Sequence, residues 1–284
     1  MAETVSIKFL KWNPIYEEER PFQIFTALRP DSKDRRTTNL EWDERAITVQ
    51  DCRGMNDLHL DTHGFMSFHL PGFDELPGEE FIRNQYVPAV KEMLKSHLEG
   101  VGTVFVFDWR VRYSKFDNNV AEINFSDQMT PLLPSNFAHI DTCPISVVQR
   151  IQSSFPEDAD RILRQRVRAV NVWKPLDYPV EEWGLAVCDG TTVDPDDLVE
   201  TDSVRKGSVT ANYYVKHNEK QKWYFLPRQE PHEALVFKHF DSDPTVPASY
   251  ALHSSIKQQI PGNMAPRPRK SIEVRALLFS EAIN

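Results

Sequence analysis

Two histidines and one aspartate have the types and the spacing of a metal-ligand set. His139 and Asp141 are two positions apart in an extended segment, so their side chains are expected on the same side of a strand. His253, far downstream, supplies a second imidazole. Two imidazoles and one carboxylate bind Fe(II) on one face and leave its other positions open. The pattern therefore predicts a non-haem iron site.

Two arginines follow the second histidine and offer a binding group for a carboxylate. Arg269 and Arg275 share one face of the last predicted strand, provided that the strand extends back to residue 269. A guanidinium group is a planar fork that binds both oxygens of a carboxylate. We therefore expect a 2-oxoglutarate-dependent iron oxygenase, in which either arginine holds the co-substrate.

The His-x-Asp pattern alone is weak evidence because it occurs three times. The three copies are His59-Leu60-Asp61, His139-Ile140-Asp141 and His239-Phe240-Asp241. His59 precedes most of the predicted strands, and we interpret it as a surface or packing residue. His239 is followed only by His253, which is too near in sequence for the strands of a barrel to return. We interpret His239 as structural too, so the copy at His139 is the candidate.

Composition excludes several classes of protein. The chain has 284 residues, of which 40% are hydrophobic, and its formal net charge is -9. A nucleic-acid-binding protein is expected to have a basic face, which this charge argues against. No apolar run is long enough for a membrane helix, and the first residues lack a signal-peptide pattern. We expect no nucleic-acid partner and no membrane partner.

The three cysteines indicate a reducing compartment. Cys52, Cys143 and Cys188 are odd in number and lack CxxC spacing, so they predict neither a disulfide framework nor a zinc site. Reduced thiols are typical of the cytoplasm, which is the expected location.

The pattern of the elements predicts a mainly β protein with flanking helices. Helical spacing covers residues 79–98 and 145–168, the second stretch being broken near Pro156. Strands are expected at 5–12, 46–50, 65–68, 101–111, 137–141, 167–173, 184–188, 209–215, 222–226, 233–240, 248–255 and 271–279. This order fits a double-stranded β-helix, the cupin-like jelly roll. We expect a single domain over residues 1–284, with residues 1–50 as an arm or lid.

Several blocks resemble a fungal and bacterial oxygenase family. That family includes hydroxylase/desaturases of the aspergillic-acid type, gibberellin desaturase-like proteins and the cephalosporin 7α-hydroxylation component. The blocks are Asp51-Cys52-Arg53-Gly54, Leu60-Asp61-Thr62-His63-Gly64-Phe65, Tyr86-Val87-Pro88, His139-Ile140-Asp141, Arg168-Ala169-Val170-Asn171-Val172-Trp173-Lys174-Pro175-Leu176, Lys222-Trp223-Tyr224-Phe225 and Arg269-Lys270-Ser271-Ile272-Glu273-Val274-Arg275-Ala276. They occur in the family's order over nearly the whole chain.

The resemblance implies an Fe(II)/2-oxoglutarate-dependent dioxygenase that uses dioxygen in fungal secondary metabolism, such as meroterpenoid biosynthesis. The substrate would be an apolar natural-product intermediate, a terpenoid or polyketide, and the outcome hydroxylation, desaturation or endoperoxide formation. The family motif assigns His139 and Asp141 to the metal and favours His253 over the rival His217. Aromatic residues are expected to line the pocket, with the last two also near the co-substrate: Phe65, Phe116, Phe137, Trp173 and Tyr224.

Three alternatives stay open. In the first, the chain is a non-catalytic partner subunit of a second oxygenase, because some family members act as paired components. In the second, it is a jelly-roll binding module in which His139 and Asp141 are structural. A homo- or heterodimer is compatible with the enzyme and with the partner subunit. A zinc hydrolase is the weakest alternative, because the sequence has no HExxH motif.

Overall fold

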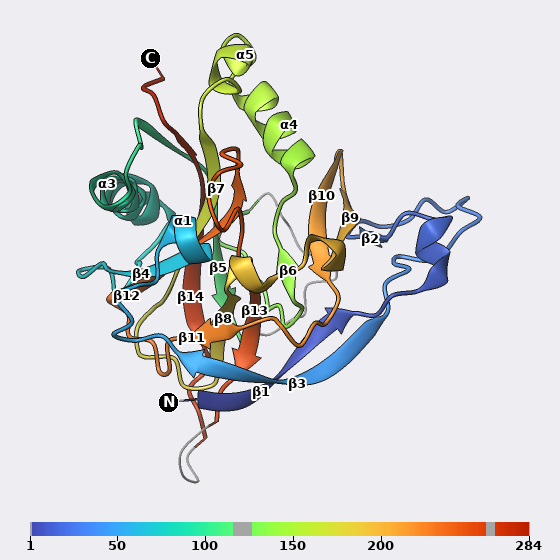
Figure 1. Cartoon of the computed structure of the whole chain (residues 1–284), viewed down its shortest axis with the longest axis horizontal. Helices are drawn as coiled ribbons and strands as arrows, with labels where there is room; N and C mark the ends of the chain where they lie inside the picture. Colours follow the sequence, from blue (N-terminus) through green and yellow to red (C-terminus); the bar gives the residue numbers. More distant parts are fainter. Residues whose placement is uncertain (1, 116–126, 260–264, 284) are drawn as a thin grey trace.

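Two β-sheets that pack face to face dominate the protein (Figure 1). The structure is a computed structural model, and it describes residues 2–115, 127–259 and 265–283. The nine-stranded sheet has the order β1 (Ala2–Leu10), β3 (Trp42–Asp51), β11 (Trp223–Phe225), β8 (Trp183–Cys188), β13 (Leu252–Lys257), β6 (His139–Ile140), β10 (Ser208–Val215), β9 (Leu198–Arg205), β2 (Phe22–Ile24). The five-stranded sheet has the order β4 (Phe65–His69), β12 (Glu233–Asp241), β7 (Val167–Pro175), β14 (Lys270–Phe279), β5 (Thr103–Tyr113). The predicted mainly β architecture is confirmed.

Strand β7 lies at the centre of the five-stranded sheet, and every one of its residues is buried. Its sequence is almost continuously apolar, as expected for a strand covered on both faces. On the inner face, Trp173 packs in a cluster with Phe237 of the same sheet and Val187 of the opposite sheet. On the outer face, Val170 and Val172 pack beneath the helices. The apolar core therefore fills the space between the sheets at one end of the sandwich.

Helices cover the outer face of the five-stranded sheet. Helix α3 (Val87–His97) presents Val90, Met93 and Leu94 to this face, following a short α2 (Glu79–Phe81) and the π-helical turn η2 (Ile82–Tyr86). The predicted helix over 79–98 is confirmed. The remaining helices are α1 (Leu60–His63), α4 (Pro144–Ser154), α5 (Ala159–Ile162), η1 (Pro14–Glu17), η3 (Gly190–Thr192) and η4 (Pro195–Asp197). The break near residue 156 is also confirmed. The predicted helical stretch was extended too far, to residue 168, because helical structure ends at Ile162 and β7 begins at Val167.

The first fifty residues divide into two parts. Strand β1 pairs antiparallel with β3 along its whole length, from Ala2 opposite Gln50 to Leu10 opposite Trp42. Residues 11–41 project from that ribbon at the right of Figure 1 and contain η1 and β2, which pairs in parallel with β9. The segment is thus anchored at both ends in the nine-stranded sheet.

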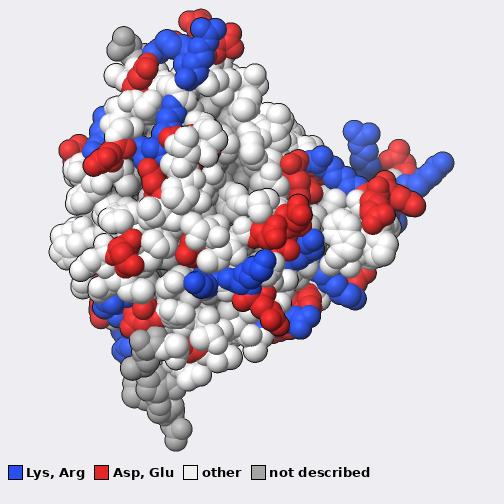
Figure 2. Space-filling model, viewed as in Figure 1, with Lys and Arg blue, Asp and Glu red and all other residues white. Residues whose placement is uncertain are grey.

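Charges of both signs are mixed on the face shown in Figure 2, including on the projecting segment 11–41. Among residues 2–115, 127–259 and 265–283, no helix combines the length and the apolar character that crossing a membrane requires.

Candidate metal centre

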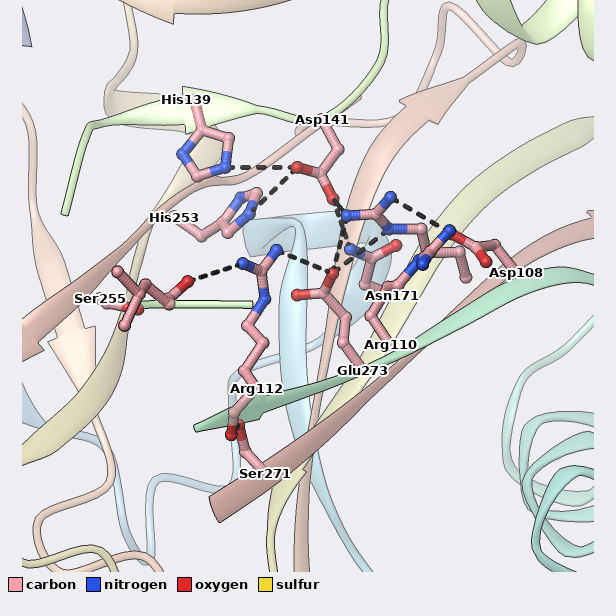
Figure 3. Close-up of polar contacts among 12 residues, drawn as sticks. Asp108, Arg110, Arg112, His139, Asp141, Asn171, His253, Ser255, Ser271 and Glu273 are labelled. Atoms are coloured by element: carbon pink, nitrogen blue, oxygen red, sulfur yellow. Dashed lines mark hydrogen bonds and ion pairs between the residues drawn. The ribbon is translucent and has the colours of Figure 1, made fainter. Parts of the chain in front are cut away.

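The three predicted ligands meet between the two sheets (Figure 3). His253 on β13 lies directly opposite His139 on β6 in the antiparallel ladder, and their ring centroids are 4.0 Å apart. Asp141 follows β6, with its Oδ1 3.2 Å from Nε2 of His139 and 3.7 Å from Nε2 of His253. One ligand atom from each residue lies within 4.8 Å of the others. Residues distant in sequence therefore converge because their strands are neighbours.

The backbone around β6 orients the ring of His139 and leaves the amide of Asp141 outside the hydrogen-bonded ladder of the sheet. The Nδ1–H of His139 donates to the carbonyl oxygen of Phe137 at 2.7 Å, which leaves Nε2 facing Asp141. Strand β6 ends at Ile140, and helix α4 begins at Pro144, a residue favoured at the first position of a helix. The chain therefore leaves the sheet between these two residues. The amide of Asp141 is consequently outside the ladder, and it donates to Nδ1 of His239 at 3.3 Å.

The second carboxylate oxygen of Asp141 is held by the opposite sheet. Its Oδ2 accepts a 2.8 Å hydrogen bond from Nδ2 of Asn171 and lies 3.1 Å from Nη2 of Arg275. Burial raises the pKa of this carboxyl group, but the charge of Arg275 and the contact with His139 outweigh it and hold the pKa well below its usual range. The carboxylate is therefore ionised and presents Oδ1 to the two imidazoles.

The electrostatics suit a divalent metal. Burial, assisted by the neighbouring His139, lowers the pKa of His253 well below its ordinary value, so its ring is neutral and can donate an electron pair. Two imidazole nitrogens and one ionised carboxylate oxygen thus point at a common position. This donor set fits the Fe(II) facial triad, and the residues present are compatible with an iron site.

Arg269 is a buried cation with unused donors. Arg269 is only 2% exposed. Its Nη1 donates to Oγ of Ser255 and to the carbonyl oxygen of Trp183, both at 3.2 Å. Within the described residues, Nε and Nη2 have no hydrogen-bond partner. Burial, with the nearby charge of Arg112, lowers the pKa of Arg269 to about 9, so it remains a cation at neutral pH. Unmet donors on a buried guanidinium fit a carboxylate ligand.

A narrow pocket lies between the histidines and Ser255, the residue whose hydroxyl accepts a hydrogen bond from Arg269. Its lining includes His139, His253, Trp173 and Ser255. Ser255 follows His253 by two positions on β13, which corresponds to roughly 7 Å along a strand. Arg269, which contacts Ser255, therefore lies further along β13 from the metal position than His253 does.

Arg275 has a different environment from Arg269. Besides Asp141, its guanidinium contacts Glu273 at 2.9 Å and Asp108 at 3.5 Å. Arg275 and Asp108 are opposite each other in the β14–β5 ladder, as are Glu273 and Arg110. Alternating charges on paired strands thus form a lattice of ion pairs beside the metal centre (Figure 3).

Two cavities meet at Asp141 and Arg275. One has a volume of about 290 Å³, and its apolar wall includes Phe107, Val147 and Leu277. The other, of about 300 Å³, reaches the projecting segment at Phe25. Arg110 and Arg205 also line both cavities. The space beside the metal centre is therefore apolar on one side and cationic on the other.

The predicted aromatic wall is largely part of the core. Phe65 packs against Tyr224 with ring centroids 5.5 Å apart, and both belong to the hydrophobic cluster between the sheets rather than to either cavity. Trp173 lines the narrow pocket beside Ser255. Phe137 serves the site through its carbonyl oxygen, and Phe116 lies outside the described residues.

The sequence argument that placed His239 away from the site was wrong, although the group of metal ligands consists of His139, Asp141 and His253. This histidine lies on β12 in the five-stranded sheet, which faces β6 and β13, and its Nε2 is 4.0 Å from Oδ2 of Asp141. Its strand reaches the site from the opposite sheet, so closeness to His253 in sequence was irrelevant. A β-bulge between Lys238 and Phe240 marks its position, and bulges often redirect side chains next to functional sites. The rival ligand His217 packs instead against Phe9, with ring centroids 5.1 Å apart.

Comparisons with known proteins place the chain in one family. A family model described as "oxidoreductase/YMDC permease-like domain" matches residues 7–279. The Fe(II)/2-oxoglutarate-dependent dioxygenase nvfI of Aspergillus novofumigatus is 32% identical over 250 residues, which cover 85% of each chain. The hydroxylase/desaturase poxK of Penicillium oxalicum is 28% identical over 279 residues, covering 86% of this chain and 82% of poxK.

A solved structure agrees with these relatives. A single-substitution variant of the iron and alpha-ketoglutarate-dependent endoperoxidase NvfI superposes with a TM-score of 0.84 at 28% identity, covering 98% of this chain and 97% of that one. The chain therefore belongs to the Fe(II)/2-oxoglutarate-dependent dioxygenases, and fungal hydroxylase/desaturases are among its relatives. The predicted jelly-roll class, enzyme class and requirement for Fe(II), 2-oxoglutarate and dioxygen are confirmed.

Proposed function

We propose that His139, Asp141 and His253 bind Fe(II), and that Arg269 binds the distal carboxylate of 2-oxoglutarate. The observation that carries the proposal is the convergence of the three ligand atoms beside a buried arginine with two unused donors. Arg275 is the less suitable co-substrate residue because it contacts three carboxylates of the protein. Trp173 would line the co-substrate pocket.

Residues around the proposed ligands hold the ligand side chains in position. Asn171 and Arg275 hold one oxygen of Asp141 and thereby keep the other directed at the metal position. The carbonyl of Phe137 fixes the tautomer of His139. Bound Fe(II), with 2-oxoglutarate and dioxygen, supplies the oxidant that removes hydrogen from a substrate carbon. Hydroxylation, desaturation and endoperoxide formation share that first step, and the placement of the substrate selects among them.

The substrate is a small natural-product intermediate, and we infer that most of its carbon skeleton is apolar, as in a terpenoid or polyketide. The apolar wall around Phe107, Val147 and Leu277 supports this inference. Phe25 of the segment 11–41 lines the second cavity, which supports a role for this segment as a lid over the substrate.

Anaerobic reconstitution tests the proposal. Adding Fe(II) and 2-oxoglutarate to the pure protein is expected to give the weak visible charge-transfer band of the chelate, and admitting oxygen is expected to release succinate. His139→Ala is expected to abolish the band, whereas His217→Ala, outside the triad, is expected to retain it. A pure wild-type protein that neither binds iron nor releases succinate would instead support the non-catalytic partner subunit.

Two expectations concern the setting of the enzyme. The buried free thiols of Cys52, Cys143 and Cys188 support the proposed cytoplasmic location. A homo- or heterodimer is the expected assembly, and light scattering after size-exclusion chromatography tests it directly.

A further inference from the structure

His239 lines the 290 Å³ cavity and carries an unused hydrogen-bond donor. Its Nδ1 accepts the amide hydrogen of Asp141, so in the neutral ring the proton resides on Nε2. The side chain is only 2% exposed, and Nε2 has no hydrogen-bond partner among the described residues.

The nearest protein acceptor does not satisfy this donor. Oδ2 of Asp141 is 4.0 Å from Nε2, which is beyond hydrogen-bonding distance, and it already interacts with Asn171 and Arg275. His239 lines the 290 Å³ cavity, so a ligand there can reach the ring. A buried N–H without a partner costs free energy, and an acceptor on a bound molecule removes that cost.

Charge indicates which acceptor fits. Arg205 lines the same cavity, and burial, together with the charge of Arg275, lowers its pKa. Arg275 lines the cavity too, but its guanidinium is already paired with three carboxylates of the protein. Asp108 also lines it, but this carboxylate is paired with Arg110 at 3.3 Å and with Arg275 at 3.5 Å. Guanidinium groups close to a neutral N–H donor favour an anionic oxygen over a neutral one.

We propose that His239 is a substrate-binding residue that donates from Nε2 to a carboxylate oxygen of the substrate. The inference rests on the proposed function, because it assumes that the cavity beside the iron is the substrate site. The substrate is then an acid with an apolar skeleton. Its acidic group contacts His239 and the arginine side of the cavity, and its carbon skeleton contacts the wall around Val147 and Leu277.

The test uses the anaerobic complex with Fe(II) and saturating 2-oxoglutarate, so that an added acid cannot occupy the co-substrate pocket. Calorimetric titrations with octanoate and with octan-2-one compare a carboxylate with a carbonyl on a similar chain. We expect octanoate to bind at least tenfold more tightly than the ketone. His239→Phe, which keeps a ring of similar size but lacks the donor, is expected to weaken octanoate binding about tenfold or more.

Two further variants separate recognition from folding. His239→Gln retains an N–H donor and is expected to recover part of the affinity, and His217→Phe makes the same substitution outside the cavity and is expected to bind octanoate like the wild type. The charge-transfer band should be equal in all four proteins. If the band is absent in the wild type, the proposed function fails. If the wild-type band forms, any of four results overturns the present inference: equal affinity for acid and ketone, no saturable octanoate binding, unchanged binding by His239→Phe, or a band lost only in that variant.

Discussion

Arg269→Met is expected to leave the ligand-free protein folded while abolishing its response to 2-oxoglutarate. The guanidinium is buried, and it forms two hydrogen bonds but leaves Nε and Nη2 unused. Losing two hydrogen bonds from a charged donor costs about 1.5–3 kcal/mol each, whereas removing two unmet charged donors returns about 1–3 kcal/mol each. Methionine fills a similar length of apolar space. The two effects are of similar size, so the free energy of unfolding is expected to change by no more than about 3 kcal/mol.

Adding 2-oxoglutarate is expected to stabilise the wild-type protein much more than the Arg269→Met variant. At a concentration one hundred times its Kd, 2-oxoglutarate stabilises the wild-type protein by about 2.7 kcal/mol, which corresponds to a rise in Tm of about 5 °C for a chain of this size. Loss of a two-pronged, charge-assisted contact weakens binding by about 2–4 kcal/mol, or roughly 30- to 1000-fold. At the same concentration the variant should therefore show a rise in Tm of no more than about 1.5 °C.

Calorimetric melting of the anaerobic Fe(II) protein, with and without 2-oxoglutarate, measures both quantities. Arg267→Met is the matched control, because this neighbouring arginine is exposed and pairs with Glu181 on the surface. It should keep the full rise in Tm. A normal rise in the Arg269→Met protein would refute the assignment of the co-substrate to Arg269.

Three other perturbations address the surroundings of the metal centre and the core. Asn171→Leu removes one of the groups that hold Asp141, so competition with a chelator should show Fe(II) binding weakened by about 10- to 100-fold. The metal-free protein should lose stability as the pH falls from about 6.5 to 4, because the pKa of buried His239 is lowered to about 4 and the unfolded chain therefore takes up protons first. Urea titrations should show that His239→Phe removes about 3 kcal/mol of this dependence. Asp241→Ala leaves the buried ammonium of Lys238 without its 2.6 Å partner, and urea unfolding should show a loss of about 3–5 kcal/mol. Equal midpoints for Asp241→Ala and the wild type would show that Asp61 alone suffices for Lys238.

Sequence periodicity predicted the elements that bring the metal ligands together. Alternation placed His139 and Asp141 on one side of an extended segment, and a later apolar strand carried His253. The long apolar run of β7 and the helical spacing of α3 were equally readable. These features depend on short stretches of sequence, which is why one chain sufficed to predict them.

Features that depend on pairing between distant strands were not predictable. Strand β9 was missed because Glu200 and Asp202 occupy half-buried positions on it, and these residue types are uncommon in strands. Arg269 and Arg275 share a face, and only their partners across the sandwich distinguish them. The position of His239 required knowledge of which sheet β12 joins.

The ladder contact between His139 and His253 has a consequence for the maturation of the enzyme. Strand β6 contributes only two residues and is held between β10 and β13, one of them close to the C-terminal end of the sequence. Both imidazoles can meet only after these three strands have joined. Iron uptake by a newly made chain should therefore lag behind closure of the sheet, and a chain shortened before β13 should remain unable to retain the metal however much of its remaining secondary structure has formed.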